Sequence, residues 1–454
     1  MAASTSTSSS IQLRSAPLPL TQYHLLEIPS ELVHLFDPPA QPSDEPPSKK
    51  RRQDPSRLTI KGRYDDQAVL TTESQTLALR AVSQSNSLLL CSIDTDGISS
   101  AASLEPESSV SVLRLRSNVT DTLELSPVVP RLDRLVGLLK ASQYQGEEEE
   151  ERRATKAARP VRKYTPKQLR SIVQASPAEL DAGLIQHHII EMDGYMRHIS
   201  PTWTVSALQL LISHLDLHAL IPDQVPLNET VEALQSMHGL RPQVVTALLT
   251  QFFGCVNARD DAIASSAADT TATITVKLDV KAIVHFLGVE TLKASARIGV
   301  PLADFQRTWT QSCLSPDFEA LAQLELLSGY YLLSPAPSPS VSLYPNPASV
   351  QIQFYSHHEL PTEPAARFQD LFLTRAAWIA SDLLPFISEL ALNDKKKDSL
   401  LLKFTRASKA KVLDWELSDA EKRAWNKDKK VIGTDGKPKK VWRDVVMYSA
   451  RVKY

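Results

Sequence analysis

A repeated unit in the second half of the chain constrains its fold more than any other feature. The first copy runs from Ser176-Pro177 to Gly194-Tyr195, and the second from Ser315-Pro316 to Gly329-Tyr330. Serine caps a helix and proline fits its first turn, while glycine ends a helix and allows the chain to turn. Each copy therefore predicts a helix followed by a short apolar strand, and its recurrence indicates a tandem array. The amphipathic helices predicted upstream of the two copies are Thr165–Val173 and Leu302–Gln311.

The C-terminal residues 363–454 have a related order of predicted elements. Helical spacing of apolar residues extends from Phe368 to Trp378, and further helices are predicted over Leu383–Leu392 and Ser399–Phe404. Val445–Tyr454 then has the pattern of a strand. Three helices, a basic loop and a strand are the order of a winged helix, a helix-turn-helix variant whose third helix and wing commonly contact nucleic acid. The expected caps of the second and third helices are Ser381 and Asp398.

Positive charge is concentrated in the same region. From Lys395 to Tyr454 there are 18 Lys and Arg against 8 Asp and Glu, whereas the preceding residues have 32 against 44. Charge runs more often form a solvated surface, but a surplus this large on one small module favours an anionic partner. The candidate phosphate contacts, expected to flank one groove-facing surface, are Lys403, Arg406, Lys409, Lys411, Lys439, Lys440, Arg443 and Arg451.

Short strands dominate the first third of the chain. They are bounded by Gly, Asp, Asn and Ser at regular spacing, which predicts a small antiparallel sheet or barrel. Few aromatic residues are available for its core, so its edges should stay open to partner strands. The predicted strands are Tyr23–Ile28, Arg57–Lys61, Ala68–Thr72, Thr76–Ala81, Ser87–Ser92, Val110–Arg116 and Thr122–Leu125, with helices over Pro29–Phe36 and Arg131–Ala141.

The chain has 454 residues, more than one hydrophobic core can serve, so several domains are expected. Five glutamates at Glu147–Glu151, followed by Arg152 and Arg153, are predicted to form a linker between a β-rich part and a helical part. The fold class is α+β. The predicted divisions are a disordered tail at 1–20, a β-rich partner-binding domain at 21–145, an acidic and basic linker at 146–160, and winged helices at 161–255, 256–350 and 351–454.

Several features bear on the cellular compartment. Residues 49–52 form a basic cluster inside a proline-rich stretch, which indicates a nuclear localisation signal, although a merely soluble loop explains the motif equally well. The cysteines are far apart and odd in number, which fits a reducing compartment. No apolar run approaches the length of a membrane span. We therefore expect a nuclear protein, with Lys49, Lys50, Arg51 and Arg52 as the import signal.

No motif for catalysis or cofactor binding is recognisable. Gly433–Pro438 lacks the spacing of a phosphate loop and is predicted to be a turn. His187-His188 with Glu191, and His357-His358 with Glu359, could bind a metal, but without Cys partners or a zincin motif they are more often structural or surface histidines. The sequence therefore predicts no enzyme, cofactor, metal or small-molecule substrate. The tryptophans expected in cores rather than as base-stacking platforms are Trp203, Trp309 and Trp378.

Short segments near both ends of the chain match a known family in order and at sensible spacing. In the N-terminal part they are Tyr23–Pro29, Leu58–Gly62, Asp66–Thr72 and Ser85–Leu90. In the C-terminal part they are Arg367–Phe372, Trp378, Leu384–Ile387 and Leu400–Phe404. No single segment is specific, but the ordered series resembles the sister chromatid cohesion Dcc family, accessory subunits of an alternative clamp loader related to replication factor C. The loop at 37–57, the glutamate run and the insert between 411 and 440 depart from the compact members of that family.

This resemblance implies a non-catalytic subunit with two kinds of partner. Its N-terminal strands would complete a shared barrel with two other clamp-loader subunits, and that assembly would dock on DNA polymerase epsilon. Its winged helices would bind single- and double-stranded DNA, and the whole would load or unload the sliding clamp PCNA. The ATPase would belong to other subunits, in agreement with the missing phosphate loop. The alternative is a winged-helix chromatin or transcription adaptor, whose β-rich part would have to fold alone.

Overall fold

The chain forms two compact units of mixed helix and strand. Unit 1 comprises Met1–Pro130 and Ser171–Glu179, and unit 2 comprises Arg131–Arg170 and Leu180–Tyr454. Within them, the computed structural model describes residues 11–15, 23–35, 58–94, 111–132, 134–155, 161–257, 274–335, 350–391, 393–414 and 441–451. The basic cluster predicted at 49–52 and the turn predicted at 433–438 lie outside these ranges.

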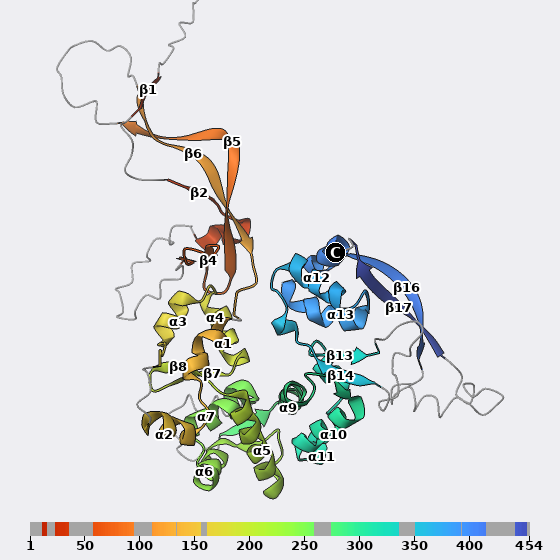
Figure 1. Ribbon diagram of the computed structural model, residues 1–454. Coiled ribbons are helices and arrows are strands. Elements are labelled where there is room, and N and C mark those ends of the chain that lie inside the picture. The colour runs from red at the N-terminus through yellow and green to blue at the C-terminus, as the bar shows by residue number, and fades with distance from the viewer. Residues whose placement is uncertain are drawn as a thin grey trace, which may run out of the picture. The chain divides into compact units, whose positions relative to one another are not determined.

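Unit 1 is built on a six-stranded sheet with the order β1-β6-β5-β4-β3, in which β2 also pairs with β6. The long strands β5 and β6 form an antiparallel ribbon that dominates the sheet in Figure 1. Of the predicted sheet or barrel, the described residues form an open sheet and no closed barrel. The sheet is not purely antiparallel as predicted, because β1 and β2 pair with β6 in parallel. The strands are β1 (Ile11–Ser15), β2 (Leu25–Glu27), β3 (Thr59–Lys61), β4 (Val69–Thr71), β5 (Thr76–Asp94) and β6 (Ser111–Pro127), with the 3-10 helix η1 (Ser30–Leu35) after β2.

Two pairs of short predicted strands are single long strands. Thr76–Ala81 and Ser87–Ser92 both lie in β5, while Val110–Arg116 and Thr122–Leu125 correspond to the two ends of β6. The polar residues that suggested a turn in β5 instead form an irregularity between Ser83 and Leu88, where the register to β6 shifts. A bulge absorbs extra residues and twists a strand without reversing its direction.

The core of unit 1 is small and sits at one end of the sheet. Leu32, Leu70 and Leu77 are buried in it. The second segment of unit 1, Ser171–Glu179, adds polar contacts: the Lys61 ammonium donates to the Ala175 carbonyl at 2.6 Å, and the Gln174 side chain donates to the Gln67 carbonyl at 2.7 Å. The unit is therefore completed by residues that lie far beyond its strands in sequence.

The glutamate run predicted as a linker forms helix α2 (Glu147–Thr155). Carboxylates in the first turn are favoured by the helix dipole, and Arg152 and Arg153 pair with glutamates three and four positions earlier. The helix is also bound to the rest of unit 2, because Arg197 pairs with Glu150 at 2.6 Å and Arg241 pairs with Glu147 at 2.7 Å. These contacts explain why the run is ordered. Before it lie α1 (Arg134–Leu139) and the 3-10 helix η3 (Lys140–Ser142), where a helix over Arg131–Ala141 was predicted.

The first copy of the predicted repeat takes a different form from the second. Its helices are α3 (Pro166–Ile172) and α4 (Pro177–Gln186), but Gly194 lies in the tight turn between β7 (Ile189–Met192) and β8 (Tyr195–His198) instead of ending a helix. Its φ of +81° is in the left-handed region that glycine tolerates. In the second copy Gly329 follows a 3-10 helix and precedes a strand. The same residue types therefore form a hairpin turn in the first copy and a helix-to-strand turn in the second.

A different repeat organises the remainder of unit 2. In the described residues, three successive modules have the same order of elements: helix, short strand, helix, helix, strand, strand. In each, a three-stranded antiparallel sheet places the third strand between the first and second. Module A contains α5 (Pro201–Leu217), β9 (Val225–Pro226), α6 (Leu227–His238), α7 (Pro242–Ala247), the π-helical turn η4 (Leu248–Phe252), β10 (Gly254–Val256) and β11 (Thr275–Leu278).

Modules B and C complete the array. Module B contains α9 (Val280–Ser295), β12 (Val300–Pro301), α10 (Leu302–Cys313), α11 (Pro316–Glu319), the 3-10 helix η5 (Leu324–Leu327), β13 (Tyr331–Ser334) and β14 (Gln351–Phe354). After the 3-10 helix η6 (His357–Glu359), module C contains α12 (Pro364–Thr374), β15 (Ala377–Ile379), α13 (Ala380–Ile387), η7 (Ser388–Leu390), α14 (Asp394–Phe404), β16 (Thr405–Asp414) and β17 (Val441–Ala450).

Modules A and B share one hydrophobic core, whereas module C has its own. Trp309 is fully buried in the first core and Trp378 in the second, and Trp203 packs against the first, as expected for structural tryptophans. The Trp309 indole donates to the Val284 carbonyl at 3.0 Å, which satisfies its polar group. Trp378 lies in β15, not in the predicted first helix, because its backbone pairs with Tyr448 of β17.

The helices of module C begin earlier than predicted. Helix α13 starts at Ala380 without a side-chain cap, so Pro385 lies inside the helix and not in its first turn. Helix α14 starts at Asp394 and is capped by Asn393 instead of Asp398. None of the helices in the described ranges has the length and apolar character that a bilayer span requires.

Candidate functional site

Helix α14, the third helix of module C, carries lysines in its first turn. The Asn393 side chain accepts a hydrogen bond from the Lys396 amide at 2.8 Å and so fixes where the helix begins. Lys397 pairs with Asp394 at 2.6 Å, but the exposed Lys395 and Lys396 form no ion pair with other described residues. Cations near a helix N-terminus are disfavoured by its dipole. These lysines therefore destabilise the helix, and an anionic partner bound next to them would offset that destabilisation.

Strands β16 and β17 continue from α14 as a ribbon of ten paired residues on each strand. At about 3.3 Å per residue its length is roughly 30 Å. Its base is anchored: Tyr448 and Ala450 pack on the core of module C, and the Thr405 hydroxyl donates to the Leu401 carbonyl at 2.7 Å. The ribbon therefore extends beyond the core that holds it (Figure 1).

The two exposed cations on the described part of β16 lie on different faces. Arg406 pairs in register with Ser449, and Lys409 pairs with Val446. Successive side chains of a strand alternate between faces, so Lys409 shares the face of Tyr448, which packs on the core, while Arg406 is on the opposite face. Arg406 and Lys409 thus lie on the two sides of the ribbon, and the prediction that the basic residues flank one groove-facing surface stays a prediction.

Lys403 and Arg451 lie where the helix meets the ribbon. Both are exposed. The Lys403 ammonium is 5.1 Å from the centre of the Phe404 ring, and the Arg451 guanidinium donates to the Leu402 carbonyl at 2.6 Å. Neither forms an ion pair with a described carboxylate, so each keeps its charge available.

The other predicted phosphate contacts lie only in part within the described residues. Lys411 and Arg443 lie in the paired backbone of β16 and β17. Lys439 and Lys440 lie outside the described residues, as do Lys49, Lys50, Arg51 and Arg52. The surface defined by described side chains therefore consists of Lys395, Lys396, Lys403, Arg406, Lys409 and Arg451, which we call the basic surface of module C.

The corresponding helices of the other modules lack this character. Helix α7 of module A has the sequence PQVVTA and no charged residue, and it buries Val244 and Val245. Helix α11 of module B has the sequence PDFE and is acidic. Equivalent helices in one repeated topology thus differ in charge, and of these three helices α14 is the one that carries lysines.

A second candidate site is the outer part of strand β5. Leu88, Leu89 and Leu90 are 53%, 50% and 37% exposed, although successive residues of a strand point to opposite faces. Ile60 on the edge strand β3 is 65% exposed. In the described residues each of these stretches pairs on one side alone, Leu88–Leu90 with β6 and Ile60 with β4. Exposed apolar residues on strands with an open edge are typical of protein-binding surfaces.

Several titratable groups have shifted pKa values because they are buried. Burial, with help from neighbouring His and Lys residues, lowers the pKa of His188 and of His198 to about 4, so both are neutral near pH 7. Burial raises the pKa of the Cys313 thiol to about 11. A thiol of that kind carries little of the reactive thiolate form. These three residues therefore have the properties of packed core groups.

Sequence reasoning missed Lys395 and Lys396 because it started the third helix too late. The signal that identifies them is Asn393, which is as good a cap as Asp398 and precedes the run of lysines. The exposed leucines at 88–90 were included in a predicted strand, but their exposure depends on how far the core of unit 1 extends.

Comparison with known proteins gives a consistent result. The family model described as sister chromatid cohesion protein Dcc1 matches residues 23–387. A mouse protein named sister chromatid cohesion protein DCC1 is 26% identical over 356 residues, covering 77% of this chain and 79% of the relative. The human protein of that name is 24% identical over 80% of this chain and 84% of the relative. A Dictyostelium discoideum protein named probable sister chromatid cohesion protein DCC1 is 22% identical over 86% of this chain and 92% of the relative.

The family match ends at residue 387, before helix α14 and the ribbon. It covers the described sheet of unit 1 from β2 onward, modules A and B, and the first two helices of module C. A match over most of the sequence, together with relatives of the same name, shows that this chain belongs to the sister chromatid cohesion protein Dcc1 family.

Proposed function

We propose that this chain serves sister chromatid cohesion as a non-catalytic subunit of a clamp loader related to replication factor C. In this proposal the sheet of unit 1 joins two other subunits, and module C holds single- or double-stranded DNA. The subunit would thereby link the loader to DNA polymerase epsilon and support loading or unloading of PCNA. Family membership implies the cohesion role. The assignment of protein binding to unit 1 and of DNA binding to module C is our inference from their surfaces.

The observation that carries the DNA-binding part is the basic surface of module C. The element order and strand order of modules A, B and C are those we assign to winged helices, in which the third helix and the strand hairpin commonly meet nucleic acid. In module C this helix and hairpin carry exposed cations without ion pairs among the described residues. Contacts of this kind go mainly to phosphates, so binding should depend weakly on DNA sequence.

A salt titration tests this directly. The full chain is titrated into labelled duplex and single-stranded DNA at several salt concentrations. Each phosphate neutralised contributes roughly 0.9 to the slope of log affinity against log salt on duplex DNA. Replacing Lys395, Lys396, Arg406 and Lys409 together by alanine should weaken binding and flatten the slope by roughly two to four. An unchanged slope would rule out the phosphate-binding role.

The matched control removes the same charge elsewhere. Arg63, Lys140, Lys167 and Lys281 are exposed and lie outside module C. Their joint replacement by alanine alters net charge equally and should leave the slope within error. If both quadruple variants lose the same affinity, binding follows overall charge and not the basic surface.

The partner-binding part rests on the open sheet of unit 1 with its exposed leucines. Co-expression of the full chain with candidate clamp-loader subunits, followed by native purification, should yield a stoichiometric complex. If the purified complex contains the chromatin-associated proteins of an adaptor and lacks clamp-loader subunits, the proposal fails.

Nuclear localisation is the third part of the proposal. It rests on the basic residues 49–52, which lie outside the described structure. Changing Lys49, Lys50, Arg51 and Arg52 to alanine should abolish nuclear import in cells depleted of the partner subunits. Depletion is needed because import on a partner would hide the loss, and retained import in those cells would refute the signal.

A further inference from the structure

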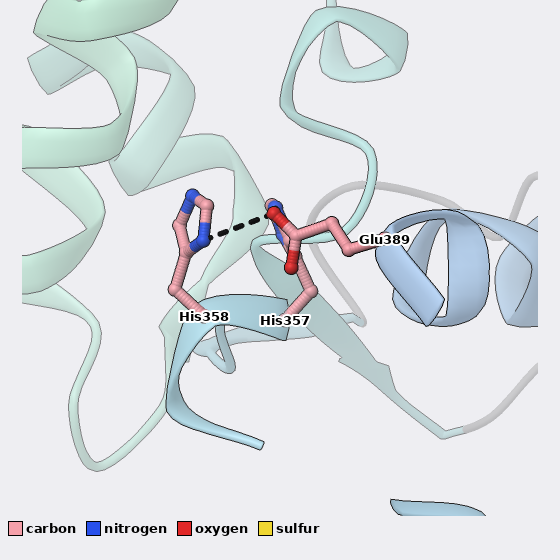
Figure 2. A group of neighbouring side chains, drawn as sticks. All are labelled: His357, His358 and Glu389. Carbon is pink, nitrogen blue, oxygen red and sulfur yellow. Dashed lines mark ion pairs between the residues drawn. The ribbon is translucent and has the colours of Figure 1, made fainter. Parts of the chain in front are cut away.

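Two histidines and a glutamate from different elements meet at the junction between modules B and C. His357 and His358 lie in η6, between the last strand of module B and the first helix of module C, and Glu389 lies in η7 of module C. Figure 2 shows both imidazole rings and the carboxylate turned toward one another. His357 Nε2 is 3.2 Å from Glu389 Oε1, and His358 Nδ1 is 3.1 Å from the same oxygen.

This grouping differs from the one that the sequence suggested. Glu359, adjacent to the histidines in sequence, is not part of the cluster, whereas Glu389 is brought in by the fold. The ligand atoms of His357, His358 and Glu389 all lie within 4.8 Å of one another. Two ligands each about 2.0 Å from a tetrahedral zinc ion lie roughly 3.3 Å apart. The two nitrogen–oxygen distances are therefore close to those of a zinc site.

The hydrogen bonds on the far sides of the rings orient them for a cation. His357 Nδ1 is 3.0 Å from the Gly329 carbonyl, which can only accept, so Nδ1 carries the proton. In the neutral ring, Nε2 then presents a lone pair to the carboxylate of Glu389, an arrangement that repels unless a proton or a metal ion lies between them. His358 Nε2 is 3.2 Å from the Tyr330 hydroxyl, which can accept its proton and leave Nδ1 free. The Gly329 carbonyl thus fixes the tautomer of His357, and outer hydrogen bonds of this kind are typical of metal-bound histidines.

The surroundings also suit an ion. The His357 side chain is only 12% exposed, while His358 and Glu389 are 39% and 36% exposed, which leaves a path for an ion and a water ligand. Gly329 allows the close approach: a Cβ there would lie 3.2 Å from His357 Nδ1 and 3.2 Å from Pro385 Cβ.

One charge opposes binding. The Arg367 guanidinium is 3.8 Å from the other Glu389 oxygen, Oε2, and donates to the carbonyls of Pro361, Phe386 and Leu360. It directs Oε1 toward the histidines, but its positive charge weakens the attraction for a dication. We therefore expect moderate affinity and not the affinity of a closed four-ligand site.

We propose that His357, His358 and Glu389 bind a divalent transition-metal ion, with Zn²⁺ the best match to two imidazoles and a carboxylate. The ion would take the place of the protons shared between the histidines and the carboxylate. Because the ligands come from the segment after module B and from module C, the bound ion would fasten these two modules together.

Metal binding by the full chain tests the proposal. Protein stripped with a chelator is titrated with Zn²⁺ in a calorimeter, and with Co²⁺ while visible absorption reports tetrahedral coordination. We expect one ion per chain, loss of binding in Glu389→Gln and in His357→Gln, and a roughly tenfold weaker site in Tyr330→Phe, which removes only the outer hydrogen bond to His358. Saturating Zn²⁺ should raise the Tm of the wild type and leave that of Glu389→Gln unchanged.

The control addresses adventitious binding by other histidines. His214 and His218 on α5 lie with ring centres 4.5 Å apart and have no carboxylate in such a cluster among the described residues. The double variant His214→Gln/His218→Gln should bind the ion as the wild type does. Absence of stoichiometric binding in the wild type would show that the cluster is an ion-pair network alone. Equal binding by wild type and Glu389→Gln, with circular dichroism confirming that the variant is folded, would also overturn the proposal.

Discussion

Two ribbons of paired strands, one in each unit, have similar backbones and different surfaces. The β5–β6 ribbon of unit 1 and the β16–β17 ribbon of module C both extend beyond the small core that anchors one end. The first exposes Leu88, Leu89 and Leu90, whereas the second exposes Arg406 and Lys409. A two-stranded ribbon without a core is marginally stable alone. In the function we propose, the apolar side chains of the first ribbon bind protein and the basic side chains of the second bind phosphate.

The largest effect should come from removing the anchor of one ribbon. Trp378 is fully buried, pairs through its backbone with β17, and donates its indole N–H to the Leu371 carbonyl at 3.0 Å. Trp378→Ala should destabilise module C by about 3–5 kcal/mol. Hydrogen exchange resolved by peptide should show lost protection in β16 and β17 with unchanged protection in β5 and β6.

DNA binding should be lost in that variant while partner binding survives. Trp378→Phe, which keeps a large aromatic ring, is the milder control and should lose less protection. If the β5–β6 ribbon loses protection as well, the two ribbons are not independent and the comparison fails.

Acid should affect the two units differently. His188 is packed among the rings of Phe252, Phe253 and Phe286, and its pKa, like that of His198, is lowered to about 4 from 6.5. Protonation of these two rings is therefore disfavoured in the native state. Their contribution to the free energy of unfolding is complete above pH 6.5 and is lost as the pH falls toward 4. At pH 5 the loss should be about 2 kcal/mol for each histidine.

Unit 1 has no buried histidine among the side chains that the structure describes. Hydrogen exchange between pH 7 and pH 5, corrected for the intrinsic rate, should thus show weakening around β7 and β8 before unit 1. His188→Leu should reduce this pH dependence, whereas His24→Gln, at an exposed position, should leave it unaltered. Equal weakening of both units would contradict this difference.

Charge placed on the leucine ribbon should separate the two partner classes. Leu88→Asp combined with Leu89→Asp should weaken partner binding at least about tenfold, because an unpaired carboxylate buried in an apolar interface is costly. DNA affinity should change little. Leu217→Asp is the control, because Leu217 is 72% exposed on a different element. Partner affinity is measured by calorimetry. If the double variant binds the partner as tightly as the wild type, the β5–β6 ribbon has no protein-binding role.

The smallest effect concerns the two faces of the basic ribbon. Arg406→Ala and Lys409→Ala each remove one cation from opposite faces of β16. If DNA contacts one face, only one substitution should lower the salt slope, by roughly 0.9. Equal loss in both variants would indicate that DNA wraps the ribbon edge. Loss in neither would place the contact on α14 and its lysines.

Local signals predicted the elements whose causes are local. Leu302–Cys313 follows the predicted amphipathic pattern closely, and Pro177 and Pro316 open helices as expected. The prediction of both helices and small sheets is confirmed, but elements that depend on distant partners were not predicted. Strand β16 has few β-branched residues and exists because it pairs with β17. Trp378 has helical spacing but is drawn into a strand by the same partner.

The candidate sites, too, were predicted only where the sequence signal is local. The accumulation of Lys and Arg after Lys395 is visible in composition, whereas the separation of Arg406 from Lys409 requires the register of the ribbon. His357 and His358 stand out as neighbours in the sequence, but Glu389 belongs to another helical turn. No spacing rule connects it to the histidines, because the contact arises from the packing of module C after module B.

The return of Ser171–Glu179 to unit 1 has a consequence for the order of events during synthesis. Ser176 and Glu179 form hydrogen bonds with Thr76. Because these two residues come about a hundred positions after Thr76, the strands leave the ribosome well before the residues that complete unit 1. At ribosomal speeds of about 5–20 residues per second, the interval from Pro130 to Glu179 lasts several seconds. During it the leucines of β5 are already outside while unit 1 is unfinished. Protease sensitivity at the Thr76 end of β5 in ribosome-bound chains should therefore fall once residue 179 has emerged, whereas Leu88, Leu89 and Leu90 stay exposed until a partner covers them.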